Sequence, residues 1–375
     1  MAEKKVGGAG LRGQVAGKTA LSTVGKSGSG LTYRGYDVKD LAENCQFEEV
    51  AYLILKGELP NQSELDAYKT KLKGLRGLPQ ALKTVLEQVP RDAHPMDVMR
   101  TGCSMLGNLE TETSFEQQGD MADRMLAAFP SIICYWYRYS HDGVRVETET
   151  DDDSIGAHFL HLLRGEKPND LHEAVMHVSL ILYAEHEFNA STFTARVCAS
   201  TLSDIHSCVT GAIGTLRGPL HGGANEAAME MIENFKDPED AEKSMLGMLE
   251  RKEKIMGFGH AIYTESDPRN AIIKHWSEKL SKDVSGENLY NVSVRCEEVM
   301  WREKKLFCNA DFFHASAYHF MGIPTKLFTP IFVMSRLTGW AGHVFEQRAD
   351  NRIIRPSADY TGSELRKVTP IAERG

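Results

Sequence analysis

The sequence predicts an all-α protein with a minor β element near its N-terminus. From residue 47 onward, apolar residues recur at spacings of three and four, which is the period of an amphipathic helix. Alternating apolar and polar runs, the pattern of half-buried strands, are nearly absent, apart from short β-like pieces at 20–24 and 31–33. A length of 375 residues exceeds what one compact core usually holds, so we expect two domains.

The predicted helices follow one another along the chain. A first apolar face starts at Phe47, and GELP (57–60) ends that helix. Ser63 is expected to cap the next helix, and Pro79 to open the one after it. A long helical stretch is predicted over 174–216, with an interruption near HEFNAST. A later helix is indicated by the single apolar stripe of Leu289, Val292, Cys296 and Val299.

Three polar segments and one glycine-rich break interrupt this helical pattern. The segments are ETETDDDS (147–154), RGEKPND (164–170) and KDPED (236–240), and the first is expected to be a solvated surface segment. The break is GPLHGGAN, in which His221 stands among four helix-poor residues. A histidine in a packed core needs no bare backbone on both sides, whereas one that meets a bulky ligand at close range does.

Composition and charge exclude several classes of protein. A formal net charge of −9 argues against a nucleic-acid binder, and no apolar run is long enough to span a membrane. The start, MAEKKVGGAG, lacks the apolar stretch of a secretory signal. Seven scattered cysteines with no CxxC pair favour free thiols in a reducing compartment. We therefore expect a cytoplasmic protein that binds neither nucleic acid nor membrane.

Two suggestive motifs fail on their spacing. GKTALSTVGKS resembles a phosphate-binding loop, but the glycine required five residues before each Gly-Lys pair is replaced by Arg12 or Ala20. HEAVMH (172–177) has one residue too many for two histidines on one helical face, and Leu182 stands where an inverted zinc motif needs histidine. The sequence therefore predicts neither an ATPase nor a metal site.

Three other segments place a polar side chain among apolar or backbone-exposing residues. They are GPLHGGAN with His221, KIMGFGHAIYTESDPRN (254–270) with His260, and CNADFFHASAYHFMGIP (308–324) with Asp311. Each alone is more typical of a structural residue than of a catalytic one. Together, two histidine donors and one carboxylate base could remove a proton beside a carbonyl and stabilise the resulting enol.

Three arginines suggest an anionic ligand. Arg269, Arg336 and Arg355 lie in stretches otherwise composed of apolar residues or turn formers. One such arginine is usually a surface salt-bridge partner. Three aimed at one small cavity would form a clamp for a dicarboxylate, because guanidinium binds carboxylate through two parallel hydrogen bonds.

These motifs, in this order, resemble the citrate synthase family. The matching stretches are EHEFNASTFTARV (185–197), GPLHGGAN, GFGHAIY with DPR, the NAD of NADFF, SRLTGWAGH and RPSADYTG, and the resemblance covers about 33–362. It implies an almost entirely helical fold, with a large domain built from both chain ends (1–220 and 317–375) and a small domain inserted between them (221–316).

The resemblance also implies a reaction that joins an acyl-CoA to oxaloacetate. Asp311 would remove a proton from the thioester α-carbon, His221 would stabilise the enolate, and His260 would polarise the keto group. The residues implied for the oxaloacetate carboxylates are His186, Arg269, Arg336 and Arg355. Those implied for the CoA adenine are Lys254, Ile255, Met256, Gly257 and Phe258. In this family the last arginine reaches in from the partner of a homodimer, and no metal or prosthetic group is needed.

One position departs from the family pattern. Many citrate synthases carry arginine shortly after the GFGH histidine, where it can meet a CoA phosphate, but this chain has Tyr263, Thr264 and Glu265 there. Phosphate binding would then fall to other cations, such as Lys254 or Lys305.

The acyl substrate is suggested by two of the matching stretches. EHEFNAST and GHVFEQRADNRIIRPSADYTG are most similar to the 2-methylcitrate synthase branch, which implies propionyl-CoA as main substrate with side activity on acetyl-CoA. The alternative is a citrate synthase that mainly uses acetyl-CoA. A non-catalytic acyl-CoA sensor is disfavoured by Asp311, because binding alone needs no base. Ala310 and Tyr183 are expected either to line the acyl pocket or to pack helices.

Overall fold

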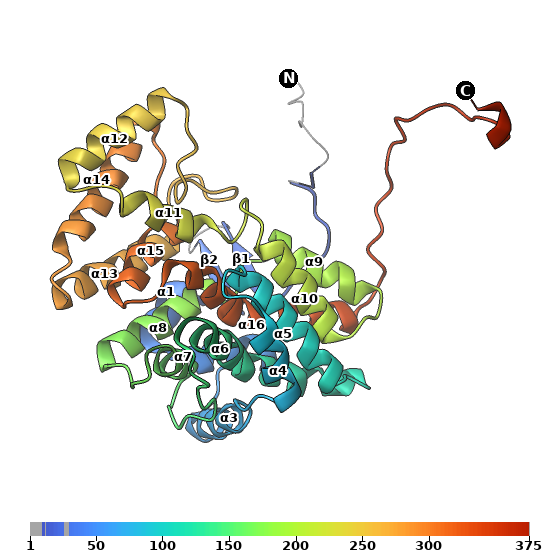
Figure 1. The fold of residues 1–375 in the computed structure, drawn as a ribbon, viewed down its shortest axis with the longest axis horizontal. Helices are drawn as coiled ribbons and strands as arrows, with labels where there is room; N and C mark the ends of the chain where they lie inside the picture. Colours follow the sequence, from blue (N-terminus) through green and yellow to red (C-terminus); the bar gives the residue numbers. More distant parts are fainter. Residues whose placement is uncertain (1–9, 12, 26–29, 375) are drawn as a thin grey trace.

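The computed structural model describes residues 10, 11, 13–25 and 30–374, and these are mostly helical (Figure 1). The predicted all-α class is confirmed. The β element is a three-stranded antiparallel sheet of β1 (Ser22–Val24), β2 (Leu31–Tyr33) and β3 (Tyr36–Asp37), in that order. The segment MAEKKVGGAG, which predicts that there is no secretory signal, lies outside the described residues except for Gly10. Arg12, which replaces a glycine of the phosphate-binding motif, also lies outside them.

Most helices surround one central helix, α16 (Phe328–Ala349). It is buried along nearly its whole length and packs against α2, α5, α6, α8, α9 and α10. A helix that is apolar on all sides belongs in the middle of a large core. The helices of this body are α1 (Val38–Asn44), α2 (Phe47–Lys56), α3 (Gln62–Gly74), α4 (Gln80–Gln88), α5 (Pro95–Leu109), α6 (Gln118–Asp142), α7 (Ile155–Arg164), α8 (Asp170–Tyr183), α9 (Ala190–Ser200) and α10 (Ile205–Leu216), with 3₁₀ turns η1 (Phe115–Gln117) and η2 (Thr325–Leu327).

A second group of five helices lies at the upper left of Figure 1. Helix α12 packs on α14, and α15 packs on both α11 and α13. The predicted small domain, 221–316, includes four of these helices and ends inside the fifth, because α15 continues to Phe320. The five helices are α11 (Ala224–Ile232), α12 (Pro238–Glu250), α13 (Pro268–Asp283), α14 (Glu287–Lys304) and α15 (Ala310–Phe320).

The N-terminal cap of α3 corrects one prediction. Ser63 lies inside the helix, and the cap is Asn61, whose side chain accepts the backbone N–H of Glu64 at 3.0 Å. The Glu64 carboxylate in turn accepts the backbone N–H of Asn61 at 2.8 Å. This reciprocal capping box satisfies two otherwise unpaired amides, so the helix starts one residue before Ser63.

The acidic segment 147–154 is only partly solvated, which corrects another prediction. Thr148, Asp152 and Ser154 are buried, whereas most of the acidic residues between them are exposed. The buried guanidinium of Arg76 donates hydrogen bonds to the backbone carbonyl oxygens of Thr150 (2.9 Å) and Asp152 (2.7 Å). The segment is therefore fixed to the body through its backbone, which an acidic composition does not reveal.

The glycine-rich break joins α10 to α11 as a tight turn. The amide of Gly222 donates to the carbonyl oxygen of Leu216 at 2.9 Å, and the amide of His221 donates to Gly218 at 2.9 Å. A Cβ at position 222 would clash with that same Leu216 oxygen, at a separation below van der Waals contact. Glycine is therefore required for the turn that presents His221.

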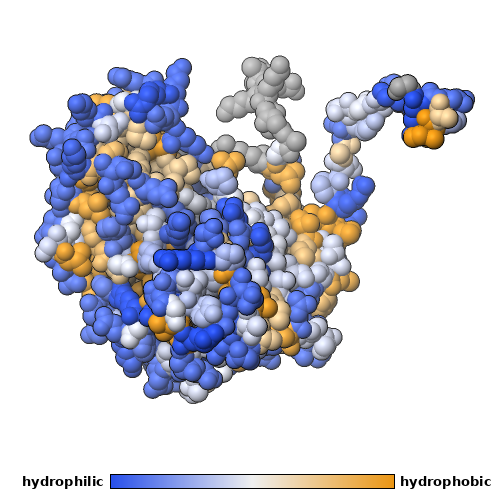
Figure 2. Space-filling model, in the orientation of Figure 1, coloured by the Kyte–Doolittle hydropathy of each residue, from blue (hydrophilic) through white to orange (hydrophobic). Residues whose placement is uncertain are grey.

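The chain ends in an extended segment that leaves the body (Figure 1). Asn351 and the amide of Ile354 are held by Ser200 at the end of α9, and beyond them nearly every residue is exposed up to a final 3₁₀ turn, η3 (Ile371–Glu373). Several large apolar or aromatic side chains on this segment are exposed, among them Tyr360 and Leu365. Figure 2 shows hydrophobic residues at the far end of the segment. Among the described residues, no helix is both long and apolar enough to cross a membrane.

Candidate active site

Asp311, the predicted base, lies in the first turn of α15. The helix is capped by Asn309, whose side chain accepts the backbone N–H of Asp311 at 3.0 Å. The hydroxyl of Tyr183, the last residue of α8, donates to Oδ1 of Asp311 at 2.6 Å. Burial raises the pKa of Asp311, and the Tyr183 hydrogen bond opposes that rise. One carboxylate oxygen is thus held in place while the group remains a stronger base than an exposed aspartate.

His221 is arranged as a neutral hydrogen-bond donor. Its Nε2 accepts the backbone N–H of Ser191 at 3.3 Å and lies 2.8 Å from the Ser191 hydroxyl. That hydroxyl is itself fixed by a hydrogen bond from Trp340 Nε1 at 3.0 Å. Burial and the charge of Arg336 lower the pKa of His221 to about 4. Since Nε2 accepts, the single ring proton sits on Nδ1.

His260 presents the opposite nitrogen as its donor. Its Nδ1 accepts the backbone N–H groups of Ile262 (3.1 Å) and Tyr263 (3.3 Å). Burial and Arg269 lower its pKa to about 4, so the ring is neutral and carries its proton on Nε2. The His260 ring lies 5.1 Å from that of His186, between ring centroids.

His186 lies in the connection between α8 and α9 and is buried. Its Nε2 is 3.1 Å from the hydroxyl of Tyr263. Burial, Arg269 and Arg336 together hold its pKa well below the usual value. Sequence reasoning noted Tyr263 only as a departure from the family pattern, and its hydrogen bond to His186 was not predicted.

Two of the three predicted arginines reach this site. Arg269 is buried and makes a two-pronged ion pair with Asp267, at 2.9 and 2.7 Å. Arg336 is 1% exposed, and its Nε donates to the carbonyl oxygen of Tyr183 at 2.6 Å. Within the described part of the chain, Arg336 makes no direct ion pair with a carboxylate. The buried carboxylate of Glu185 acts on the Arg336 charge without forming a direct ion pair, so the arrangement favours an anionic ligand that pairs with the guanidinium directly.

Arg355 does not join this group within its own chain. It is exposed on the extended C-terminal segment, just beyond the residues anchored at Ser200.

Phe332 on α16 lies between Tyr183 and His221. Its ring stacks on Tyr183 with centroids 4.1 Å apart and lies 6.4 Å from the His221 ring. The Arg336 guanidinium lies 4.7 Å from its centroid. An apolar wall therefore runs between Asp311, the predicted base, and His221. No motif in the sequence distinguished Phe332 from other core residues.

The segment predicted to take CoA, 254–258, lies directly beside the start of α15. The carbonyl oxygen of Gly257 accepts the amide of Asn309 at 3.0 Å. Gly257 has φ of +88°, and a Cβ there would lie 2.8 Å from Phe312, so glycine allows the close approach. Lys254 also borders a hollow of about 880 Å³ between α11 and α12. Lys305 does not border it, and its ammonium lies over the Trp301 ring at 5.5 Å.

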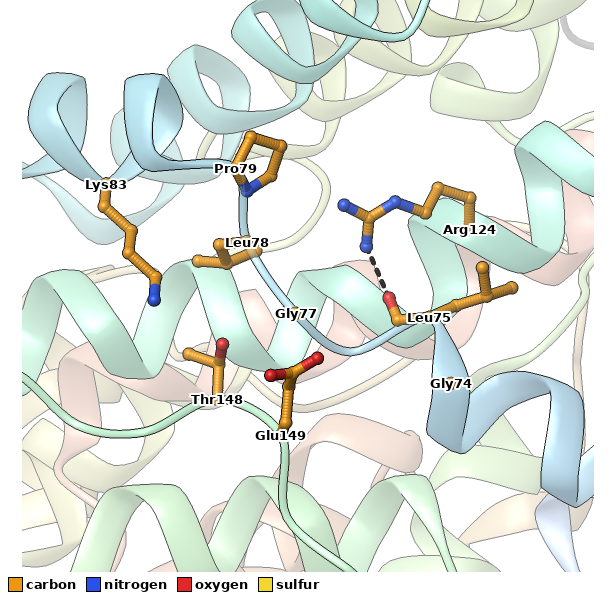
Figure 3. Close-up of a pocket in the computed structure, with 9 residues that line it drawn as sticks. All are labelled: Gly74, Leu75, Gly77, Leu78, Pro79, Lys83, Arg124, Thr148 and Glu149. Atoms are coloured by element: carbon orange, nitrogen blue, oxygen red, sulfur yellow. Dashed lines mark hydrogen bonds between the residues drawn. The ribbon is translucent and has the colours of Figure 1, made fainter.

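A smaller cavity of about 380 Å³ lies elsewhere, between the end of α3 and the start of α4 (Figure 3). Its lining includes Lys83, Arg124 and Glu149, and none of the predicted site residues. Among the residues that the structure describes, no group of three or more His, Cys, Asp or Glu could hold a metal ion.

Comparison with known proteins gives consistent results. Residues 10–357 match the model of the family described as "Citrate synthase, C-terminal domain". The chain is 78% identical to 2-methylcitrate synthase of Shewanella oneidensis, covering 99% of each chain. It is 43% identical to citrate synthase 2 of Bacillus subtilis, covering 97% of this chain and 98% of that one. Among solved structures, it resembles citrate synthase of Thermoplasma acidophilum in a ternary complex with carboxymethyl coenzyme A and oxaloacetate (TM-score 0.91, 34% identity, 97% and 98% coverage).

Proposed function

The chain belongs to the citrate synthase family, and on that premise we propose that it condenses propionyl-CoA with oxaloacetate and water, giving 2-methylcitrate and free CoA. The family membership confirms the resemblance predicted from the sequence. The observation that carries the proposal is a partly buried base, Asp311, in one site with two buried arginines, of which Arg336 makes no direct ion pair with a carboxylate among the described residues. The choice of propionyl-CoA is supported by the similarity to the Shewanella enzyme.

The first chemical step is removal of a proton from the α-carbon of the thioester. Asp311 takes this proton through the oxygen that Tyr183 leaves free. An aspartate removes so weakly acidic a proton only if the enolate oxygen is stabilised as it forms, and His221 Nδ1–H supplies that hydrogen bond. One preorganised donor of this kind is worth roughly 3 kcal/mol, or about 10²–10³ in rate.

In the second step the α-carbon attacks the keto carbon of oxaloacetate. His260 polarises the keto oxygen with its Nε2–H and then protonates it. Arg269, Arg336 and His186 hold the two carboxylates of oxaloacetate in this chain. Hydrolysis of the resulting CoA thioester makes the overall reaction effectively irreversible.

The remaining parts of the proposal concern binding and assembly. The backbone of Lys254–Phe258 takes the CoA adenine, and neither metal nor prosthetic group takes part. The enzyme is a cytoplasmic homodimer in which Arg355 completes the partner's oxaloacetate site. The exposed apolar side chains of the C-terminal segment support this assembly, because a second copy would cover them. The chain divides into a large domain (1–220 with 317–375) and a small one (221–316).

Release of free CoA thiol on mixing with oxaloacetate tests the proposed reaction. Thiol should appear from propionyl-CoA only when oxaloacetate is present. An acyl-CoA sensor would bind the thioester without releasing thiol, and that result would contradict the proposal.

Domain closure predicts that the two substrates bind cooperatively. The oxaloacetate residues come from both groups of helices, so oxaloacetate should bind first and draw the small domain down. CoA affinity, measured by calorimetry, should rise at least several-fold when oxaloacetate is present. Linkage requires oxaloacetate affinity to rise by the same factor with CoA. Independent binding of the two ligands would remove the closure argument.

Enlarging Ala310 should shift the acyl preference. Ala310 is buried directly before the base, and the room it leaves would accept the extra methyl group of propionyl-CoA. Ala310→Leu should therefore penalise propionyl-CoA more than acetyl-CoA, changing the ratio of their kcat/KM values by roughly tenfold. Ala81→Leu, at an exposed position on α4, is the matched control. An unchanged ratio in the Ala310 variant would remove that residue from the pocket.

A further inference from the structure

Asp267 is a buried aspartate for which the proposed chemistry has no role. It precedes α13 as its N-terminal cap and is 3% exposed. Its Oδ1 accepts the backbone N–H of Arg269 at 3.0 Å and the Nε–H of the same residue at 2.9 Å. Its Oδ2 accepts a guanidinium N–H of Arg269 at 2.7 Å and the backbone N–H of Ala310 at 3.0 Å. Each carboxylate oxygen therefore accepts two hydrogen bonds.

The hydrogen bond to Ala310 connects two parts of the site that are 43 residues apart in sequence. Ala310 is the first residue of α15, and its amide has no partner within the helix. The next amide, that of Asp311, is held by Asn309. The backbone at the start of α15 is thus held by the side chains of Asp267 and Asn309. Asp267 also forms the ion pair with Arg269, which is proposed to bind oxaloacetate.

The geometry of Arg269 leaves part of the guanidinium for substrate. Nε and Nη2 are directed at Asp267, while Nη1 makes no hydrogen bond with any residue that the structure describes. A substrate carboxylate that binds Nη1 shares one rigid, planar cation with Asp267. Any movement of Arg269 toward substrate must then act on the carboxylate that holds Ala310.

We propose that Asp267 is a positioning residue that couples oxaloacetate binding at Arg269 to the placement of Asp311. The inference rests on the proposed function, since it assigns Arg269 to oxaloacetate and Asp311 to the acyl-CoA. A residue that only caps α13 and neutralises Arg269 would affect folding and oxaloacetate affinity. A coupling residue also determines how strongly oxaloacetate improves the acyl-CoA site.

The test compares CoA binding with and without oxaloacetate in Asp267→Asn and in a matched control. The control is Asp237→Asn, which changes the exposed aspartate cap of α12, remote in sequence from the site residues. CoA itself is used as the ligand because it cannot react. In wild type and in the control, saturating oxaloacetate should raise CoA affinity at least several-fold. In Asp267→Asn, CoA affinity should change less than twofold at saturating oxaloacetate, and kcat should fall at least tenfold.

A second variant covers the case in which Asp267→Asn does not fold. Asp267→Glu keeps the charge beside Arg269 but its longer side chain displaces the carboxylate from Ala310. Asp267→Glu should still bind oxaloacetate, but oxaloacetate should no longer raise the affinity for CoA.

If oxaloacetate raises CoA affinity in either folded variant by the same factor as in wild type, the inference is overturned. It is also overturned if oxaloacetate does not raise CoA affinity in wild type. Failure of the proposed function gives a different result, because wild type would then release no thiol from propionyl-CoA.

Discussion

Replacing Asp311 with asparagine is expected to lower kcat by about 10³-fold or more while oxaloacetate still binds. An amide is nearly the same size as a carboxylate and can still accept the Tyr183 hydrogen bond, so the local structure should persist. It cannot take a proton from carbon, however. The expected loss lies at or above the upper part of the usual range for a general base.

Steady-state kinetics and calorimetry together measure this effect. Thiol release gives kcat, and oxaloacetate titration of the same preparation shows that the site is folded. Asp283→Asn, at the exposed end of α13, is the control and should keep wild-type activity. More than a tenth of wild-type activity in the Asp311 variant would mean that another group is the base.

The second large effect concerns Arg355 and the partner subunit. Arg355→Ala and His260→Ala should each be nearly inactive, because each removes a group from every site of the proposed homodimer. When the two proteins are unfolded and refolded together, a hybrid dimer contains one site with both groups intact. Random pairing makes half of the dimers hybrid, so about a quarter of wild-type activity should return.

The recovery of activity requires the extended C-terminal segment, which carries Arg355, to reach the partner subunit. Arg355 lies on a segment that leaves its own body after the anchor at Ser200, which agrees with that arrangement. The fraction of hybrid dimers is counted by native mass measurement. If hybrids form and no activity returns, Arg355 serves its own subunit or lies outside the site.

Helical periodicity predicted much of the fold because it reports directly which side of a helix is buried. The helix starting at Phe47 and ending before GELP is observed as α2, with Gly57 in a left-handed conformation at its end. Caps are harder to predict, since Asn61 and Ser63 are both good caps and the reciprocal bond with Glu64 decides between them. The prediction that the acidic segment 147–154 is solvated was partly wrong. Its backbone accepts hydrogen bonds from Arg76, and composition does not encode such contacts.

The residue types of the site were easier to predict than their connections. Glycine-rich or apolar surroundings distinguished His221, His260 and Asp311, and the tautomers of both histidines now follow from their backbone contacts. The hydrogen bond from Tyr183 to Asp311 joins residues 128 positions apart, so no local spacing could reveal it. The sequence predicts Tyr183 either as a wall of the acyl pocket or as a helix-packing residue, and it does not indicate the hydrogen bond to Asp311.

The ratio of kcat/KM for propionyl-CoA to that for acetyl-CoA, at saturating oxaloacetate, tests the central claim most directly. The two acyl groups differ by one methylene, which is worth about 1–3 kcal/mol in a fitted pocket, so both thioesters should react. We predict a ratio above one, with measurable turnover of acetyl-CoA. A ratio below one would contradict this account of the acyl site and identify the enzyme as a citrate synthase that mainly uses acetyl-CoA.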